Sequence, residues 1–229
     1  MILPSQYYEE SLYPLQNGVL NAINSYGTHF FLTGGTALSR AYYHHRYSDD
    51  LDFFVTSDPE YKKQVDMIIA RLSADGFFPE TKSEIVRDVS YTSFKVGWQK
   101  SETLLKLDFV NDLVPHFGEI QKTPLFDRTD SIRNILSNKL TALFRYAGKD
   151  VADIREIALH EKIDWPLIIR EAREKEMGIE IPIVCEILKG MPRQEFEGIN
   201  WVQKPGWQVF CDDIDRLVFD LMNCTKKGN

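Results

Sequence analysis

The alternation of apolar and polar residues predicts a compact order of elements at the start of the chain. Residues 14–26 carry apolar side chains at helical spacing, with Pro14 suited to the first turn. Residues 29–33, His-Phe-Phe-Leu-Thr, are typical of a buried strand, which Gly34-Gly35 should end. Helical spacing resumes immediately afterwards, at Ala37, Leu38, Ala41 and Tyr42. The pattern thus predicts helix, strand, glycine turn and helix.

Further strands are predicted in the next eighty residues. Residues 50–55 alternate as a strand does, and residues 59–74 then follow helical spacing up to Gly76. Residues 90–96 and 103–110 are rich in aromatic and branched side chains, and Gly97 with polar residues separates them. We interpret these two runs as a hairpin.

The second half of the chain has a different pattern. Beyond Asp127 the spacing is almost wholly helical to about residue 190 and again over residues 212–222, with a Pro/Gly-rich interruption at 191–206. We therefore predict an α+β fold with two domains. Residues 1–126 form a mixed β-sheet with flanking helices, and residues 127–229 form a helical C-terminal domain.

Composition places the chain among ordinary globular proteins. Hydrophobic residues make up 43% and charged residues 27% of its 229 residues. No apolar run approaches the roughly 18 residues of a membrane span, and the first residues lack a basic segment before an apolar core. We expect a cytoplasmic protein without a membrane partner.

The cysteines and the net charge argue against several kinds of site. The three cysteines lack CxxC spacing, so neither a disulfide framework nor a cysteine zinc site is indicated, and we expect reduced thiols. The net charge of −7 argues against a binder of polyanions over its whole surface, while a local basic groove stays open.

Three aspartates carry the sharpest chemical signal. Asp50 and Asp52 are two apart on a predicted strand, so their side chains share one face with Cα atoms about 6.6 Å apart. Two like charges held together favour a cation between them, or else one of them takes a proton. Asp108 alternates with Leu107 and Phe109 on a strand that could lie beside the first. Three converging carboxylates can hold one or two Mg²⁺ ions and support displacement at phosphorus.

Gly34, Gly35 and Thr36 supply the complementary feature. Glycines let backbone N–H groups approach an anion closely, and the N-terminus of the following helix favours negative charge. A glycine pair alone is usually just a turn. Its place fifteen residues before the paired aspartates points to a triphosphate.

Lys139 lies near the middle of the apolar stripe of a helix predicted over residues 132–146. A buried ammonium group without a partner is costly, so Lys139 should meet a carboxylate or a phosphate. The surrounding segment 128–149 holds one acid, Asp130, and five basic residues: Arg128, Arg133, Lys139, Arg145 and Lys149. This is a locally positive stretch of an acidic chain.

Purely structural interpretations compete with this chemistry. Asp50 and Asp52 also fit strand-edge charges that pair with Arg40 or Arg46, and Asp108 alone also fits a surface acid.

The helical half has its own alternatives. Lys139 also fits a side chain that reaches solvent or forms a structural ion pair. Asp150 and Asp153 lie where a helix should begin, and acids there favour the helix dipole whatever the chemistry.

Five segments in the expected order resemble the AbiEii/AbiGii-type nucleotidyltransferase toxins of the DNA polymerase β-like superfamily. They are TGGTAL at 33–38, RYSDDLDF at 46–53, LKLD at 105–108, KLTALFR at 139–145 and KDVAD at 149–153. The resemblance covers about half the chain, and the segment with the serine and the paired aspartates is fairly specific. Relatives often carry Arg directly before the aspartate where this chain has Lys149, which keeps the charge but not the geometry.

The resemblance implies a role for each matched residue. It implies metal ligands at Asp50, Asp52 and Asp108, the last also helping to deprotonate the acceptor hydroxyl. It implies triphosphate contacts at Gly34, Gly35 and Thr36. Lys139 is then the catalytic residue that neutralises phosphate charge, and Asp153 completes the helical motif. Arg46 and Ser48 orient the turn or contact phosphate.

The leading hypothesis is a Mg²⁺-dependent nucleotidyltransferase, with Mn²⁺ as the alternative ion. The resemblance implies a toxin of a toxin–antitoxin system in phage defence, with a cognate antitoxin and an NTP substrate. Its favoured acceptor is an RNA hydroxyl, above all tRNA. The alternatives are a non-catalytic nucleotide-binding partner protein, and transfer to a small-molecule or protein hydroxyl, which the acidic net charge keeps open.

Overall fold

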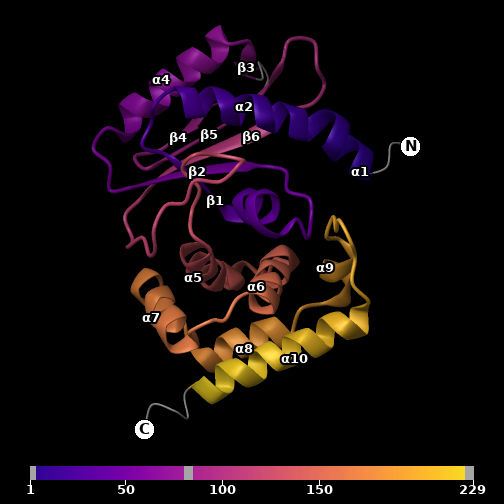
Figure 1. The fold of residues 1–229 in the computed structure, drawn as a ribbon. Coiled ribbons are helices and arrows are strands. Elements are labelled where there is room, and N and C mark those ends of the chain that lie inside the picture. Colours follow the sequence, from indigo (N-terminus) through magenta and orange to yellow (C-terminus); the bar gives the residue numbers. More distant parts are fainter. Residues whose placement is uncertain (1–3, 80–84, 225–229) are drawn as a thin grey trace. The chain divides into compact units, whose positions relative to one another are not determined.

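A computed structural model describes residues 4–79 and 85–224 (Figure 1). The chain divides into two compact units. The first combines Met1–Leu113 with Glu119–Asp130, and the second combines Val114–Gly118 with Ser131–Asn229. A short segment ahead of residue 119 thus belongs to the second unit.

The first unit is built on a mixed sheet. Its strands are β1 (Phe31–Thr33), β2 (Leu51–Thr56), β3 (Phe77–Pro79), β4 (Val86–Arg87), β5 (Tyr91–Trp98) and β6 (Leu105–Asp112). The order is β1-β2-β6-β5-β3, and β4 also pairs with β5. Only the β2–β6 pair among these is parallel. The predicted hairpin is present as the antiparallel pair β5–β6, whereas the short strands β3 and β4 were not predicted.

Period-two alternation explains which face of this sheet is buried. Phe53 of β2 and Phe109 of β6 are fully buried and stack with ring centroids 5.2 Å apart. Tyr61, the first residue of α4 (Tyr61–Ala74), donates a hydrogen bond to the Phe109 carbonyl (3.0 Å). Figure 1 shows α2 (Tyr13–Ser25) and α4 along one face of the sheet. The alternate residues of β2 and β6 therefore point to the other face.

The helices of the first unit follow the predicted pattern with one addition. The predicted helices at 14–26 and 59–74 correspond to α2 and α4. Upstream of α2, helical structure continues through elements the pattern did not predict, α1 (Pro4–Tyr7) and the π-helical η1 (Tyr8–Leu12). After β1, the short α3 (Gly34–Thr36) leads into the π-helical η2 (Ala37–Tyr43).

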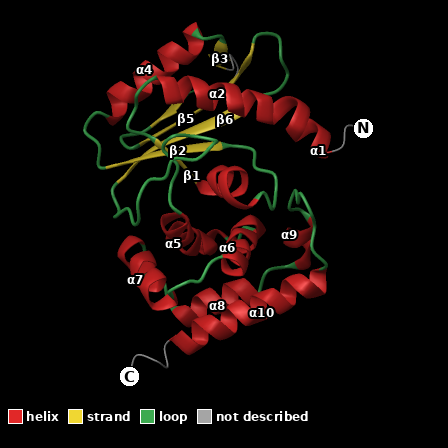
Figure 2. Cartoon of the chain, viewed as in Figure 1, coloured by secondary structure: helices red, strands yellow, loops and turns green. Residues whose placement is uncertain are grey.

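The second unit is helical in its described part (Figure 2). Its elements are α5 (Ile132–Ala142), the 3₁₀ turn η3 (Leu143–Arg145), α6 (Gly148–His160), α7 (Trp165–Lys175), α8 (Ile181–Lys189), α9 (Arg193–Glu197) and α10 (Trp207–Cys224). The short α9 lies inside the predicted interruption, and α10 begins at Trp207 rather than at residue 212. Among the described helices, none combines the length and apolar character needed to cross a membrane.

Local signals explain where these helices begin. The Ser131 hydroxyl accepts a hydrogen bond from the Asn134 backbone N–H (3.1 Å) and so caps α5. Asp164 caps α7 in the same way through the N–H of Leu167 (3.2 Å). The cysteines of this unit, Cys185, Cys211 and Cys224, are free thiols. The predicted fold class, a mixed sheet with helices and a helical C-terminal part, is confirmed.

Candidate functional site

The parallel pairing of β2 and β6 brings two of the three aspartates together. Asp52 and Asp108 are register partners on these neighbouring strands, so their side chains leave the same face of the sheet. Asp50 comes directly before β2 and is two residues from Asp52. All three are partly exposed, whereas the intervening Leu51 is fully buried. Register and burial pattern thus place the aspartates on the face opposite the aromatic core.

The carboxylate of Asp108 is already engaged by two neighbours. Nζ of Lys106 lies 2.5 Å from its Oδ2, and the Tyr91 hydroxyl donates a hydrogen bond to its Oδ1 (2.9 Å). Burial lowers the pKa of the Lys106 ammonium, but the hydrogen bond to Asp108 and the charges of Asp108, Tyr91 and Asp50 outweigh it and raise that pKa.

This engagement bears on metal binding. The three aspartates offer hard oxygen donors, which suit Mg²⁺ or Mn²⁺, and paired like charges favour such a cation. Within the part of the chain that the structure describes, however, no three His, Cys, Asp or Glu side chains are grouped so that they could hold a metal ion. The donor chemistry fits a divalent ion, and the Asp108 carboxylate is instead directed at Lys106 and Tyr91.

The glycine turn lies directly against this acidic face. Gly34 has φ +69°, and a Cβ there would overlap Oδ2 of Asp52 and lie 3.1 Å from its Cγ. A Cβ at Gly35 would overlap the guanidinium of Arg46 and lie 3.1 Å from Oγ of Ser48. Only glycine fits either position without displacing these side chains.

The next residue ties the turn to β2. The Thr36 hydroxyl donates a hydrogen bond to the backbone carbonyl of Asp50 (2.5 Å). Together with the contacts of Gly34 and Gly35, this bond sets the start of the α3–η2 helix beside the strand that carries the paired aspartates. Of the residues predicted to contact triphosphate, Gly34 thus lies against Asp52, and Thr36 is bonded to Asp50. Arg46 and Ser48, predicted to orient the turn or contact phosphate, lie against Gly35.

Arg40 has a different environment from the one considered in the sequence. It donates hydrogen bonds to Gln16 (2.9 Å) and Asn17 (2.6 Å) of α2, and its guanidinium lies 4.1 Å from the ring centroid of Tyr13. The structure thus directs Arg40 to α2 rather than to the paired aspartates.

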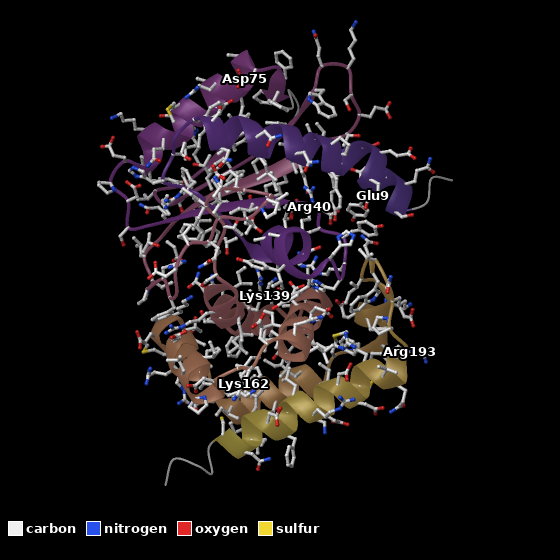
Figure 3. The ribbon with its side chains drawn as sticks, viewed as in Figure 1. Glu9, Arg40, Asp75, Lys139, Lys162 and Arg193 are labelled. Atoms are coloured by element: carbon white, nitrogen blue, oxygen red, sulfur yellow. The ribbon has the colours of Figure 1, made fainter. Side chains whose placement is uncertain are left out.

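Lys139, which Figure 3 labels in the helical unit, meets two carboxylates there. Its Nζ lies 2.7 Å from Oδ1 of Asp150 and 2.6 Å from Oδ2 of Asp153, and both aspartates are fully buried. Arg145 adds a second positive charge at Asp150 (3.2 Å). Two cations thus balance two buried anions, so Lys139 meets carboxylates, one of the two kinds of partner predicted for it.

Three residues near the acidic face were not singled out from the sequence. Lys106 shares a strand face with Asp108 by its spacing of two, a signal that was available. Tyr91 and Asp130 carry no such signal, because they reach the site only through register and folding. Asp130 is fully buried and accepts a hydrogen bond from the Thr33 hydroxyl (2.5 Å), directly before the glycine turn.

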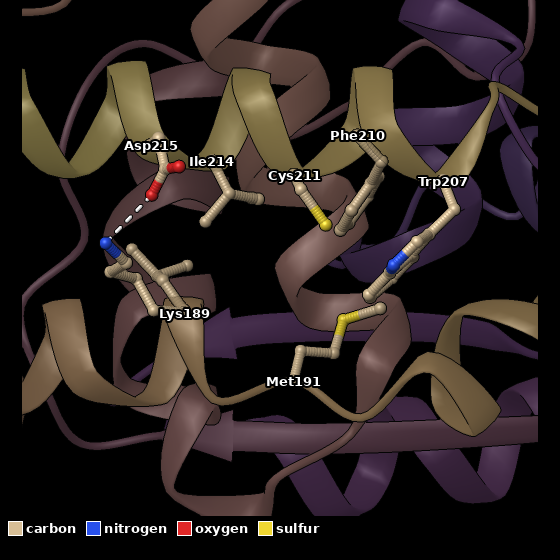
Figure 4. Close-up of a pocket in the computed structure, with 8 residues that line it drawn as sticks. Lys189, Met191, Trp207, Phe210, Cys211, Ile214 and Asp215 are labelled. Atoms are coloured by element: carbon tan, nitrogen blue, oxygen red, sulfur yellow. Dashed lines mark ion pairs between the residues drawn. The ribbon is translucent and has the colours of Figure 1, made fainter.

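A separate pocket lies within the helical unit (Figure 4). It has a volume of about 200 Å³ and is lined mainly by apolar side chains of α8 and α10 and the loop between them, with the Lys189–Asp215 ion pair (2.9 Å) at one side. It is smaller than typical ligand pockets and contains none of the predicted site residues.

Carboxylates on adjacent strands beside a glycine turn at a helix start are typical of one class of protein, the enzymes that transfer phosphoryl or nucleotidyl groups. Residues 19–220 match the family described as "Nucleotidyl transferase AbiEii toxin, Type IV TA system". The chain therefore belongs to the AbiEii nucleotidyltransferase toxin family, and the predicted resemblance and enzyme class are confirmed.

Solved structures show the same fold. JHP933 from Helicobacter pylori has a TM-score of 0.69 at 18% identity, covering 99% of this chain and 96% of that one. A putative nucleotidyltransferase from H. pylori has a TM-score of 0.66 at 19% identity, covering 96% and 98%. MenT4, a nucleotidyltransferase toxin from Mycobacterium tuberculosis, has a TM-score of 0.60 at 14% identity, covering 93% and 83%. The comparison with curated proteins gave no match.

Proposed function

We propose that this nucleotidyltransferase toxin is Mg²⁺-dependent and transfers a nucleotide from an NTP to an RNA hydroxyl, with tRNA as the favoured acceptor. The observation that carries the proposal is the register pairing of Asp52 with Asp108 beside a turn that admits only glycine. Family membership supports the transferase, the NTP and an antitoxin partner. The metal, the acceptor and the residue roles are what the proposal adds.

In this reaction the acceptor oxygen attacks the α-phosphorus of the NTP, and the bond to the β-phosphate oxygen breaks so that pyrophosphate leaves. Asp50, Asp52 and Asp108 would hold Mg²⁺, which when bound supplies charge stabilisation to the attacking and leaving oxygens. Asp108 takes the proton of the acceptor hydroxyl. The N–H groups of the turn at Gly34 and Gly35, with Thr36, bind the triphosphate.

Side chains around the turn have supporting roles. The side chains of Arg46 and Ser48 pack against Gly35. In this role they hold the backbone of the turn in place for binding phosphate oxygens. Lys139 and Asp153 are predicted from the family motif to act at the nucleotide. Because the structure directs Lys139 to Asp150 and Asp153, its first role is to hold the two helices α5 and α6 together, and its phosphate contact stays a prediction.

The test is a labelling assay with the full chain. Each of the four α-³²P-labelled NTPs is incubated with Mg²⁺ and total tRNA, and we expect label in the RNA from at least one of them. EDTA and Asp52→Asn should each abolish labelling. Asp66→Asn is the matched control, because Asp66 is an exposed carboxylate of α4 that pairs with Arg87 (2.7 Å) away from the site.

The outcomes separate the proposal from its alternatives. Label in protein or in a small molecule, with none in RNA, would overturn the RNA acceptor and leave the transferase. Labelling that survives EDTA or Asp52→Asn would overturn the assigned metal site.

A further inference from the structure

Lys106 forms an ion pair with Asp108, one of the three aspartates proposed to bind the metal ion. It shares its strand face with Asp108, and its ammonium lies 2.5 Å from Oδ2 of that carboxylate. The Lys106 side chain is 37% exposed and that of Asp108 only 13%, so the pair is shielded on the carboxylate side. The positively charged side chain of Lys106 therefore contacts a carboxylate that, in the proposed function, binds the metal ion.

The surrounding charges explain why Lys106 turns toward Asp108. Its register partner across β5–β6 is Lys95, and like charges directly opposite each other repel. Asp50 adds a negative charge close enough to raise the pKa of Lys106. The Tyr91 hydroxyl holds the other carboxylate oxygen of Asp108 (2.9 Å), which fixes the carboxylate for the ammonium. Lys106 thus neutralises an acidic face that would otherwise repel itself.

We propose that Lys106 is an internal counter-ion for Asp108, which a divalent cation must displace before it can bind this carboxylate. The inference rests on the proposed metal role of Asp108. The Lys106 ammonium, 2.5 Å from Oδ2, repels a divalent cation that approaches the same oxygen, so the two positive charges compete for it. The energy of the Lys106–Asp108 ion pair is then subtracted from the affinity for metal, which keeps the empty enzyme from holding metal tightly.

The prediction concerns metal affinity measured without nucleotide. The probe is Mn²⁺, and the free ion is followed by electron paramagnetic resonance during a titration of the full chain. Lys106→Met keeps the length of the side chain and removes its charge, so we expect a dissociation constant about tenfold lower than that of the wild type, the effect of one partly exposed ion pair. Lys106→Arg keeps the charge and should bind Mn²⁺ as the wild type does.

Two further variants make the result specific. Lys95→Met removes a lysine from the neighbouring position of the same face, and its affinity should stay within about twofold of the wild type because Lys95 is exposed. Adding Asp108→Asn to Lys106→Met should cancel the gain. Lys106→Gln also removes the charge, so it should raise the affinity for Mn²⁺ as Lys106→Met does. If far-ultraviolet circular dichroism shows that Lys106→Met is misfolded, Lys106→Gln is measured in its place.

The inference is overturned if Lys106→Met and Lys106→Gln bind Mn²⁺ no more tightly than the wild type, if Lys95→Met shows an equal gain, or if no variant binds Mn²⁺. RNA labelling by the wild type is measured in parallel. If RNA is labelled but Lys106→Met binds Mn²⁺ no more tightly, only the counter-ion role of Lys106 is overturned. If Lys106→Met binds Mn²⁺ more tightly but RNA is not labelled, only the proposed transfer to RNA is overturned.

Discussion

Gly34 shows how one residue joins the backbone to the candidate site. Its φ of +69° lies in the region that other residues enter only with strain, and its missing side chain leaves room for Oδ2 of Asp52. Gly34 is thus required for two independent reasons, its positive φ and the space that it leaves for the Asp52 carboxylate. Gly35 is required only for space, because its neighbours are Arg46 and Ser48 and its φ is not positive.

We expect Gly34→Ala to lower RNA labelling more than tenfold, because the new Cβ displaces the Asp52 carboxylate. Denaturant unfolding should also show a loss of about 1–2 kcal/mol from the left-handed backbone and the overlap. Gly27→Ala is the matched control, since Gly27 has φ +68° with nothing within 4 Å of its Cβ position. It should lose stability and keep activity. Equal activity of the two variants would contradict the role of Gly34.

At this scale the sequence predicts positions better than contacts. The spacing of Asp50 and Asp52 and the alternation around Asp108 were enough to put each carboxylate on one face of its strand. The register that pairs Asp52 with Asp108 and brings Tyr91 to Asp108 depends on how three strands align, which no local pattern specifies. Lys106 could have been found, because a spacing of two on a strand is a local signal.

At the scale of elements, long periodic segments were predicted and short ones were not. Helices α2 and α4 bury apolar stripes that repeat over several turns, so their existence followed from spacing. Strands β3 and β4 have three and two residues, too few for a period to be visible, and their partner β5 decides their conformation. The same holds for the five-residue α9.

Helices α5 and α6 are joined by charge as well as by apolar packing. Lys139 reaches from α5 to Asp150 and Asp153 of α6, and both aspartates have no exposed surface. Asp150 also receives Arg145 from the turn between these helices. Removing a single partner from such a cluster leaves buried charge uncompensated.

Lys139→Met should therefore lower the free energy of unfolding by about 3–5 kcal/mol, measured by urea denaturation. The exposed Lys149 of α6 is the control, because Lys149→Met removes a lysine from the same region without touching a buried carboxylate. A loss below about 1 kcal/mol in Lys139→Met would contradict a structural role for the cluster. Its effect on labelling is interpretable only at temperatures where the variant is shown to be folded.

At the scale of the whole molecule, the division into two units is not a single cut in the sequence. The segment Val114–Gly118 belongs to the helical unit although Glu119–Asp130 returns to the first unit. Hydrogen bonds explain why residues 114–118 belong to the helical unit. The Phe117 N–H donates to Asn134 Oδ1 (3.0 Å), and the Ser131 hydroxyl donates to the Phe117 carbonyl (3.0 Å). The Lys175 ammonium also lies 5.2 Å from the centre of the Phe117 ring.

This arrangement predicts the stability of the helical unit on its own. A fragment of residues 114–229 should be more stable than one of residues 119–229, by less than the about 2–3 kcal/mol that two hydrogen bonds and one cation–π contact contribute, because loop closure offsets part of that sum. Residues 119–130 become a loop in the longer fragment, and closing so short a loop costs less than these contacts return. Urea denaturation followed by circular dichroism at 222 nm compares the two.

The control separates specific contacts from chain length. Phe117→Ala in the longer fragment removes the ring while keeping all residues and the backbone hydrogen bonds, so it should lose only the part due to the ring and its contact with Lys175. Lys175 also donates to Asn134 (2.7 Å) and Ser137 (2.7 Å), so its charge remains satisfied when the ring is gone. If both fragments unfold at the same urea concentration with the same slope, residues 114–118 are a passive linker and contribute no stability.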